Sequence, residues 1–338
     1  MDLQKWVIKH KGSIMAVYVN TNYSALQGQR YLGNVQNQLT TTYQRLSSGM
    51  RINSAKDDAA GLQIADRLTS QINGLNQGNR NASDGIALAQ TMEAGMDEIS
   101  GMLQKMRTLT VQAANGTNTS SDRDALGKEI ASLATEVNRI AMQTTFAGKT
   151  VLNGQSKDTS SLFGQDKTAG GEKGTAGSNG TMTLQVGSNK GDTISFGAQS
   201  VMFSKLGTNA NLFKEDGSKF FQTDKNTGEV KVNMAKLDFA DKGQDTYVGN
   251  VIDLMDNMIS TIDGLRADLG AIQNRLESSI RNQSNVAANE ADARSRIRDA
   301  DFAEESANLT QQNIIQQAAS SMLMQANTRP QLGLSLLG

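Results

Sequence analysis

The stretch of residues 251–276, VIDLMDNMISTIDGLRADLGAIQNRL, repeats apolar residues at alternating steps of four and three positions. The series consists of Val251, Met255, Met258, Ile262, Leu265, Leu269, Ile272 and Leu276. Such steps return to one face of an α-helix every seven positions, so this pattern is typical of a coiled-coil seam. The methionines belong to the seam and do not indicate a cofactor site. The sequence therefore predicts a long helix that packs against other helices.

Two further apolar series lie upstream. The members of one are Leu126, Ile130, Leu133, Val137 and Ile140, again at steps of four and three. The other runs from Leu68 to Met106. Polar Asn79 and Glu93 interrupt it and its phase shifts once, which indicates a stutter within one continuous helix.

The limits of this third helix follow from turn-forming residues. The chain has no proline before Pro330, so one helix can extend from Asp57 to Ala114, about 85 Å at 1.5 Å per residue. The next residues, 115–121 (NGTNTSS), are turn and capping types. We expect the helix to end there and the helix that carries Leu126 to fold back antiparallel.

Between residues 155 and 242 the pattern changes from helical to alternating. Seven of the nine phenylalanines lie here, and the runs 181–186 (TMTLQV) and 192–196 (DTISF) alternate apolar and polar residues. Alternation with a period of two is typical of half-buried strands. The sequence predicts a small, solvent-facing α+β or β domain inserted between helical regions. We expect a mobile surface loop at 165–180, which has little to bury.

Both ends of the chain carry narrow apolar stripes on otherwise polar helices. The front stripe is Val35, Leu39, Thr42 and Leu46, and the back stripe is Ile315, Ala319, Met322 and Ala326. A helix with so narrow a stripe gains little stability alone and needs a partner. We therefore expect the first and last helices to pair with one another.

These patterns indicate a mainly α fold with a β-rich insert. The predicted divisions are 1–14 as an extension, 15–57 with 290–338 as terminal helices, 58–154 with 243–289 as a helical domain with a β-hairpin, and 155–242 as a variable surface domain. The extension holds the only tryptophan, Trp6, and the only histidine, His10. We interpret it as foreign to the native protein; a short disordered tail is the alternative.

The composition excludes several classes of function. The chain of 338 residues has no cysteine, one histidine and a formal net charge of −1. Disulfides and cysteine chemistry are excluded, and one histidine cannot build a metal cage, so we expect no metal, no cofactor and no enzyme activity. The balanced charge does not favour nucleic acid, and no apolar run reaches the ~18 residues of a membrane span.

Three short motifs have structural explanations. Residues 148–150, GKT, end like a phosphate-binding loop, but Gln143 stands where that motif needs glycine, so we expect a hairpin turn. Asp57 and Asp58 should be helix-start acids, because neighbouring helical positions diverge by about 100° and cannot share a substrate. The cluster 294–298 (RSRIR) lacks interleaved aromatic residues, which favours ion pairs over a nucleic-acid site.

Several segments of the chain closely resemble bacterial flagellin. They are 15–22 (MAVYVNTN) and 45–61 (RLSSGMRINSAKDDAAG) near the front, 295–305 (SRIRDADFAEE) near the back, and the closing PQL and LSLL within 330–337. The resemblance covers roughly residues 15–154 and 245–337. It departs from the family pattern at 1–14 and at Gly338.

The resemblance implies a structural subunit of the extracellular flagellar filament that serves swimming. It places the terminal helices in an inner coiled-coil tube, with their stripes as polymerisation contacts, the long helices in a surrounding shell, and the insert toward solvent. It implies export of an uncleaved chain by a type III apparatus, an export chaperone at the C-terminal helix, and contacts with filament cap and hook–filament junction proteins.

Three alternatives remain open beside a filament subunit. The first is a hook–filament junction protein, and the second is an adhesin whose insert binds surface glycans. The third is an enzymatic flagellin, but this class needs a His-Glu-x-x-His zinc motif in the insert, where the chain has no histidine.

The resemblance also implies recognition by a Toll-like receptor. It places the patch within residues 104–112 and on the returning helix, at Lys105, Arg107, Leu109 and Glu129. On helical spacing Lys105 and Leu109 lie one turn apart and away from the apolar seam, so we expect both to face a partner. The family has arginine at position 105, and lysine cannot replace its bidentate contact, so recognition should weaken. An ordinary solvated face is the alternative.

Overall fold

The computed structural model describes residues 21–154, 161–163, 180–207, 221–223, 230–232 and 248–335. The chain divides into two compact units. The terminal unit combines Met1–Ser70 with Asn289–Gly338, and the central unit is Gln71–Ala288. The expected extension and most of the expected loop lie outside the described residues. The domain limits drawn from the sequence stay a prediction.

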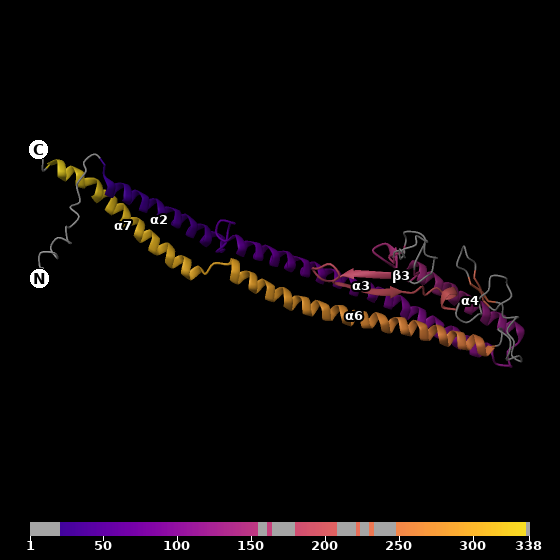
Figure 1. The fold of residues 1–338 in the computed structure, drawn as a ribbon. Helices are drawn as coiled ribbons and strands as arrows, with labels where there is room; N and C mark the ends of the chain where they lie inside the picture. Colours follow the sequence, from indigo (N-terminus) through magenta and orange to yellow (C-terminus); the bar gives the residue numbers. More distant parts are fainter. Residues whose placement is uncertain are drawn as a thin grey trace, which may run out of the picture. The chain divides into compact units, whose positions relative to one another are not determined.

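The terminal unit pairs the two ends of the chain. Helices α2, Tyr23–Ser48, and α7, Phe302–Ser335, lie side by side (Figure 1). Helix α2 is capped at its start by the side chain of Asn22 and ends at Gly49, where φ is 70°, a value that glycine adopts without strain. The Nδ2 atom of Asn22 donates a hydrogen bond to the carbonyl of Ala326 at 2.8 Å. The start of α2 therefore lies against the end of α7, which confirms that the first and last helices pair and shows that they run antiparallel.

Three long helices build the central unit. They are α3, Ala59–Ala113, α4, Ser120–Gln143, and α6, Val248–Arg298, of which α3 begins and α6 ends in the terminal unit. A capping box closes the turn before α4, because the side chains of Thr119 and Asp122 each accept the other's backbone N–H. The long helix and the turn that follows it are thus confirmed.

Polar pairs between α3 and α6 show how these two helices are oriented relative to each other. The Nε2 atom of Gln273 donates to Oε2 of Glu93 at 2.9 Å, and Nδ2 of Asn79 donates to Oγ of Ser284 at 3.3 Å. Residue numbers fall along α3 as they rise along α6, so the helices are antiparallel. The two polar residues that interrupt the apolar series therefore bond to polar partners on the neighbouring helix.

The predicted seams lie in the apolar core of the central unit. Eight of their thirteen residues are at most 3% exposed, and five are partly buried against the same core. The buried eight are Ile130, Val137, Val251, Met255, Met258, Ile262, Leu269 and Leu276, and the others are Leu126, Leu133, Ile140, Leu265 and Ile272. Ala134 and Ala141, which the seam omits, are also fully buried, so the core face of α4 is wider than a single seam.

A short hairpin follows α4. Strands β1, Thr145–Phe146, and β2, Lys149–Thr150, pair antiparallel. The two residues between them have positive φ, 50° at Ala147 and 79° at Gly148, as a two-residue hairpin turn requires. The GKT motif therefore belongs to a turn, as predicted.

A longer hairpin packs on α3. Its strands are β3, Gly180–Gln185, and β4, Thr193–Ala198, and their alternating burial confirms the period-two prediction. A glycine of α3 makes room for it, because a Cβ atom at Gly78 would lie 2.0 Å from the carbonyl oxygen of Val186. The Val186 side chain belongs to the same apolar core as the helices. The hairpin thus shares the helical core, which the sequence pattern did not indicate.

The other described parts of the middle region are short. Helix α5, Phe203–Leu206, is tied to α4 by Asn138, whose Oδ1 accepts the backbone N–H of Phe203 at 2.9 Å. Strands β5, Phe221–Thr223, and β6, Val230–Val232, pair antiparallel. A β-containing region between helical regions is therefore confirmed.

Candidate functional site

Two breaks between helices meet in the terminal unit. One separates α2 from α3, and the other separates α6 from α7. The N–H of Arg51 donates to the carbonyl of Arg298 at 2.7 Å, and the N–H of Ala300 donates to the carbonyl of Gly49 at 3.0 Å. These breaks belong to the longest two segments that carry the family resemblance, so distant parts of the sequence form one junction.

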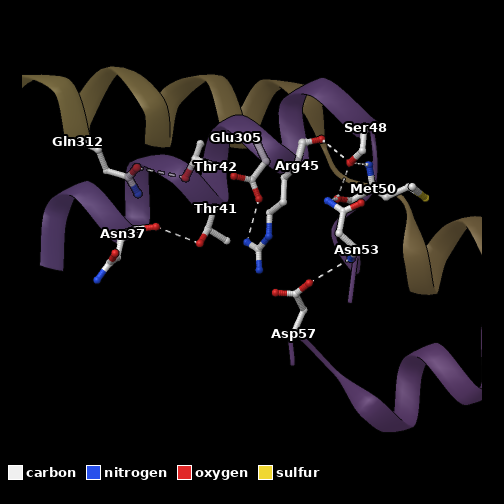
Figure 2. A network of polar contacts seen from close by, with 10 residues as sticks. All are labelled: Asn37, Thr41, Thr42, Arg45, Ser48, Met50, Asn53, Asp57, Glu305 and Gln312. Atoms are coloured by element: carbon white, nitrogen blue, oxygen red, sulfur yellow. Dashed lines mark hydrogen bonds and ion pairs between the residues drawn. The ribbon is translucent and has the colours of Figure 1, made fainter. Parts of the chain in front are cut away.

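A carboxylate organises the loop between α2 and α3. Oδ2 of Asp57 accepts the N–H of Asn53 at 3.1 Å (Figure 2). It also accepts the N–H of Ser54 at 2.9 Å and the Ser54 hydroxyl at 3.1 Å. The backbone N–H of Ser54, followed by that of Asn53, lowers the pKa of the Asp57 carboxyl, because both bond its charged form. The neighbouring Asp58 accepts the N–H of Gly61 at 2.9 Å and caps α3. The prediction that both residues are acids at a helix start is therefore right for Asp58. It is wrong for Asp57, which accepts hydrogen bonds from the loop before the helix.

An ion pair joins α2 to α7 beside this loop. Nη1 of Arg45 lies 3.1 Å from Oε1 of Glu305, whose side chain is only 9% exposed (Figure 2). Nearby, the buried Thr42 donates from Oγ1 to Oε1 of Gln312 at 3.1 Å. Removing Arg45 would leave the Glu305 carboxylate buried without its partner, which is unfavourable, so we expect these contacts to fix the register of α2 against α7.

The arginine cluster before α7 also forms polar contacts. Nη1 of Arg294 donates to Oγ1 of Thr69 at 3.4 Å, and Nε of Arg296 lies 3.0 Å from Oδ2 of Asp292. These contacts agree with the expectation that the arginines of residues 294–298 form ion pairs within the protein.

The apolar stripes at the ends lie only partly in the contact between α2 and α7. Val35, Leu39 and Ala319 are buried, and Leu46, Ile315 and Ala326 are half-buried. Met322, by contrast, is 70% exposed. The prediction that Met322 belongs to the paired seam is therefore wrong. Leu323 takes that place, because a Cβ atom at Gly28 of α2 would lie 3.2 Å from its Cδ1.

Large exposed apolar side chains gather on the two terminal helices. Among the described residues, eight of the twelve lie on α2 and α7 and are 52–73% exposed, whereas the other four are 37–46% exposed. The eight are Tyr23, Leu26, Tyr31 and Tyr43 on α2, and Phe302, Ile314, Met322 and Met324 on α7. These side chains are therefore available for contact with another molecule. We call these eight residues the terminal apolar surface.

The residues expected to form a receptor patch lie in two exposed ion pairs. Nζ of Lys105 lies 2.8 Å from Oε1 of Glu129 on α4. Arg107 forms two hydrogen bonds with Asp256 of α6, of which Nη2 to Oδ2 measures 3.2 Å. The bond to Asp256 raises the pKa of the Arg107 guanidinium. The structure therefore brings Lys105 and Glu129 together, and Asp256 is a residue that the sequence did not single out.

Leu109 departs from the expectation for this patch. It is 8% exposed and belongs to the apolar core of the central unit. It follows Met106 by three positions and so continues the seam, which means that the expectation of an exposed Leu109 is wrong. Val111, two positions further, is 46% exposed and is the apolar side chain that this end of α3 presents.

Metal-ligand clusters and membrane-spanning helices are absent from the described parts of the chain. Among them, no group of three or more His, Cys, Asp or Glu side chains could hold a metal ion. None of their helices is both long and apolar enough to span a lipid bilayer.

The two terminal helices thus pair with one another and leave large apolar side chains uncovered. Residues 19–157 match the bacterial flagellin N-terminal helical region, and residues 252–337 match the bacterial flagellin C-terminal helical region. The chain therefore belongs to the bacterial flagellin family, whose members are the subunits of flagellar filaments.

Relatives match this chain over almost its whole length. It is 37% identical to flagellin A of Vibrio cholerae serotype O1 and 38% identical to flagellin D of Vibrio anguillarum, each over 96% of this chain and 100% of the relative. A solved flagellar hook-associated protein from Vibrio parahaemolyticus covers 72% of this chain and 100% of its own, with a TM-score of 0.50 and 16% identity. That likeness concerns the fold alone.

Proposed function

We propose that the chain is exported from the cell and polymerises through α2 and α7 into a filament that drives swimming. The observation that carries this proposal is the terminal apolar surface, whose eight side chains are at least 52% exposed. Further copies that cover it would remove apolar area from water, which favours association by about 25 cal/mol for each Å².

The two-helix pair suits an open polymer. A contact between unlike faces of identical subunits continues into a helical filament when its rotation does not close a ring. Both α2 and α7 contribute exposed apolar side chains to the terminal apolar surface, so one subunit can offer different faces to different neighbours. In this proposal the paired ends form the inner tube and the helices of the central unit form the shell around it.

The proposed partners follow from the family. They are further copies of the chain, an export chaperone at the C-terminal helix α7, and the filament cap and hook–filament junction proteins. An export chaperone has a physical use here, because Ile314, Met322 and Met324 are 62–70% exposed before assembly.

Replacing exposed apolar side chains tests polymerisation. Ile314→Ser should reduce the polymer recovered by sedimentation, because it removes an apolar contact of the assembled state while deleting nothing buried in the subunit. Met142→Ser is the matched control, since Met142 is an exposed apolar residue of α4 outside the terminal apolar surface. Equal loss of polymer in both variants, or in neither, would contradict the role of α2 and α7.

A second proposed function is recognition by a Toll-like receptor. It is supported by the exposed pair of Lys105, 58% exposed, and Glu129, 45% exposed, together with Arg107. Lys105→Arg should strengthen activation of the receptor in reporter cells, because the guanidinium can bind a carboxylate with two hydrogen bonds. Lys190→Arg, in the β3–β4 turn, is the control for a charge-preserving exchange. If both variants are as potent as the original chain, Lys105 is not part of the contact.

A further inference from the structure

We propose that Met322 and Met324 are sites of reversible oxidation that decide whether a subunit can join the filament. The inference rests on the proposed polymerisation through α7. In the thioether form both side chains contribute to the terminal apolar surface. In the sulfoxide form they would exclude the subunit from assembly.

Exposure separates these two methionines from the others that the structure describes. Met322 is 70% and Met324 is 64% exposed, whereas Met142, the next most exposed of those described, is 40% exposed. The core methionines are Met92, Met96, Met106, Met255 and Met258, and each is at most 1% exposed. Because oxidation of methionine follows access to the sulfur, an oxidant in solution should reach α7 first.

The two side chains flank the contact between α2 and α7. Leu323 lies between them in sequence and packs against Gly28 of α2. Successive helical residues point about 100° apart, so Met322 and Met324 project to opposite sides of that contact. Met322 also lines a groove between the two helices, together with Tyr31 and Ala319. One methionine therefore stands on each flank of the helix pair.

The reaction needs an oxidant such as hypochlorous acid. The thioether sulfur loses two electrons and gains one oxygen, the chlorine of hypochlorous acid gains two electrons, and the products are the sulfoxide, chloride and a proton. The sulfoxide is polar and chiral, in place of a flexible apolar side chain. Covering its oxygen in an apolar contact without a hydrogen-bond donor is unfavourable, so the modified subunit should remain unassembled.

Assembly should in turn protect these positions. Once neighbouring subunits cover α7, the sulfur atoms of Met322 and Met324 are no longer accessible to the oxidant. Oxidation would then act on free subunits and spare the finished filament. A methionine sulfoxide reductase supplied with a dithiol would return a rejected subunit to the assembling pool, because the dithiol gives up two electrons and becomes a disulfide while the sulfoxide oxygen leaves as water.

Oxidation followed by a polymerisation assay tests this inference. The full chain is treated with hypochlorous acid, each methionine is followed by peptide mass spectrometry, and polymer is measured by sedimentation. We expect Met322 and Met324 to react at least about tenfold faster than Met92 and Met106, because oxidation follows exposure. Treated chain should lose most of its polymer, and a methionine sulfoxide reductase with dithiothreitol as the reductant should restore it.

Variants separate the two methionines from general damage. The double variant Met322→Leu with Met324→Leu should polymerise after treatment, whereas Met142→Leu should be inhibited like the original chain. Equal inhibition of the double variant, uniform oxidation of all methionines, or equal oxidation of Met322 in subunits and filaments would overturn the inference. Failure of untreated chain to polymerise would contradict the proposed function itself, and the oxidation rates would still decide whether Met322 and Met324 react selectively.

Discussion

Replacing Gly78 by alanine tests how the β3–β4 hairpin lies on α3. A Cβ atom at this position would lie 2.0 Å from the carbonyl oxygen of Val186, and such a contact cannot exist. The hairpin would have to move away from the helix by more than 1 Å to reach an ordinary contact. Gly101 of the same helix is the matched control, because nothing lies within 4 Å of a Cβ atom there.

Two opposing effects set the expected change in the free energy of unfolding. Alanine in place of a helical glycine stabilises a helix by roughly 1 kcal/mol, and this gain applies to both variants. Only Gly78→Ala displaces the hairpin, whose Leu184, Val186 and Phe196 side chains are 5–8% exposed. Re-exposing one such side chain costs about 1.5–3 kcal/mol. The two variants should therefore differ in unfolding free energy by about 1.5–3 kcal/mol, the cost that only Gly78→Ala carries.

Urea unfolding followed by circular dichroism measures this difference. We expect Gly101→Ala to be more stable than the original chain and Gly78→Ala to be less stable. Hydrogen exchange in β3 and β4 should also rise in Gly78→Ala alone. If both alanine variants are equally stabilised, the hairpin does not rest on Gly78, and the reasoning from the close contact is wrong.

Three further predictions concern the core, the loop and the receptor patch. Leu269→Asp should lower the unfolding free energy by several kcal/mol, because Leu269 is 3% exposed and a buried charge lacks a partner; an unchanged melting temperature would show that it is not core. The lowered pKa of Asp57 means that its charged form stabilises the loop above the ordinary value of 3.8, and that this contribution is lost as the pH falls through the lowered pKa. The protection of the Ser54 N–H against hydrogen exchange, relative to an unstructured peptide at the same pH, should therefore fall in acid, because this N–H bonds the Asp57 carboxylate. Asp57→Asn should abolish that pH dependence; an unchanged dependence in the variant would refute the assignment. Leu109→Ala should destabilise the central unit by about 2–5 kcal/mol in thermal unfolding, as buried leucines do, and full stability together with lost receptor activation would instead restore Leu109 as a contact.

Local repeats made the helices predictable from the sequence. Steps of four and three residues at Val251 to Leu276 predict a helix that packs on others, because this periodicity depends only on helical geometry. The same holds for β3 and β4, whose alternating residues predict strands. The turn at Gly148 was also predictable, since a two-residue hairpin needs positive φ.

Contacts between distant segments were not predictable in this way. Arg45 and Glu305 are 260 positions apart, and nothing in their local sequence specifies that they meet. The glycines of α3 weaken a helix in isolation, and contacts with the distant β3–β4 hairpin explain three of them. A Cβ atom at Gly74, Gly78 or Gly85 would lie within 2.6 Å of an atom of that hairpin. Met322 and Leu323 are adjacent apolar residues, three and four positions after Ala319. Both steps occur in a helical seam, so the sequence pattern does not decide which of the two belongs to it.

Cryo-electron microscopy of filaments assembled from this chain tests the central claim most directly. The claim is that α2 and α7 carry the contacts between subunits. It predicts that Tyr31, Ile314 and Met322, each more than half exposed in the single chain, contact neighbouring subunits in the map. A filament in which these side chains remain in solvent, while the central unit alone joins the subunits, would contradict the account.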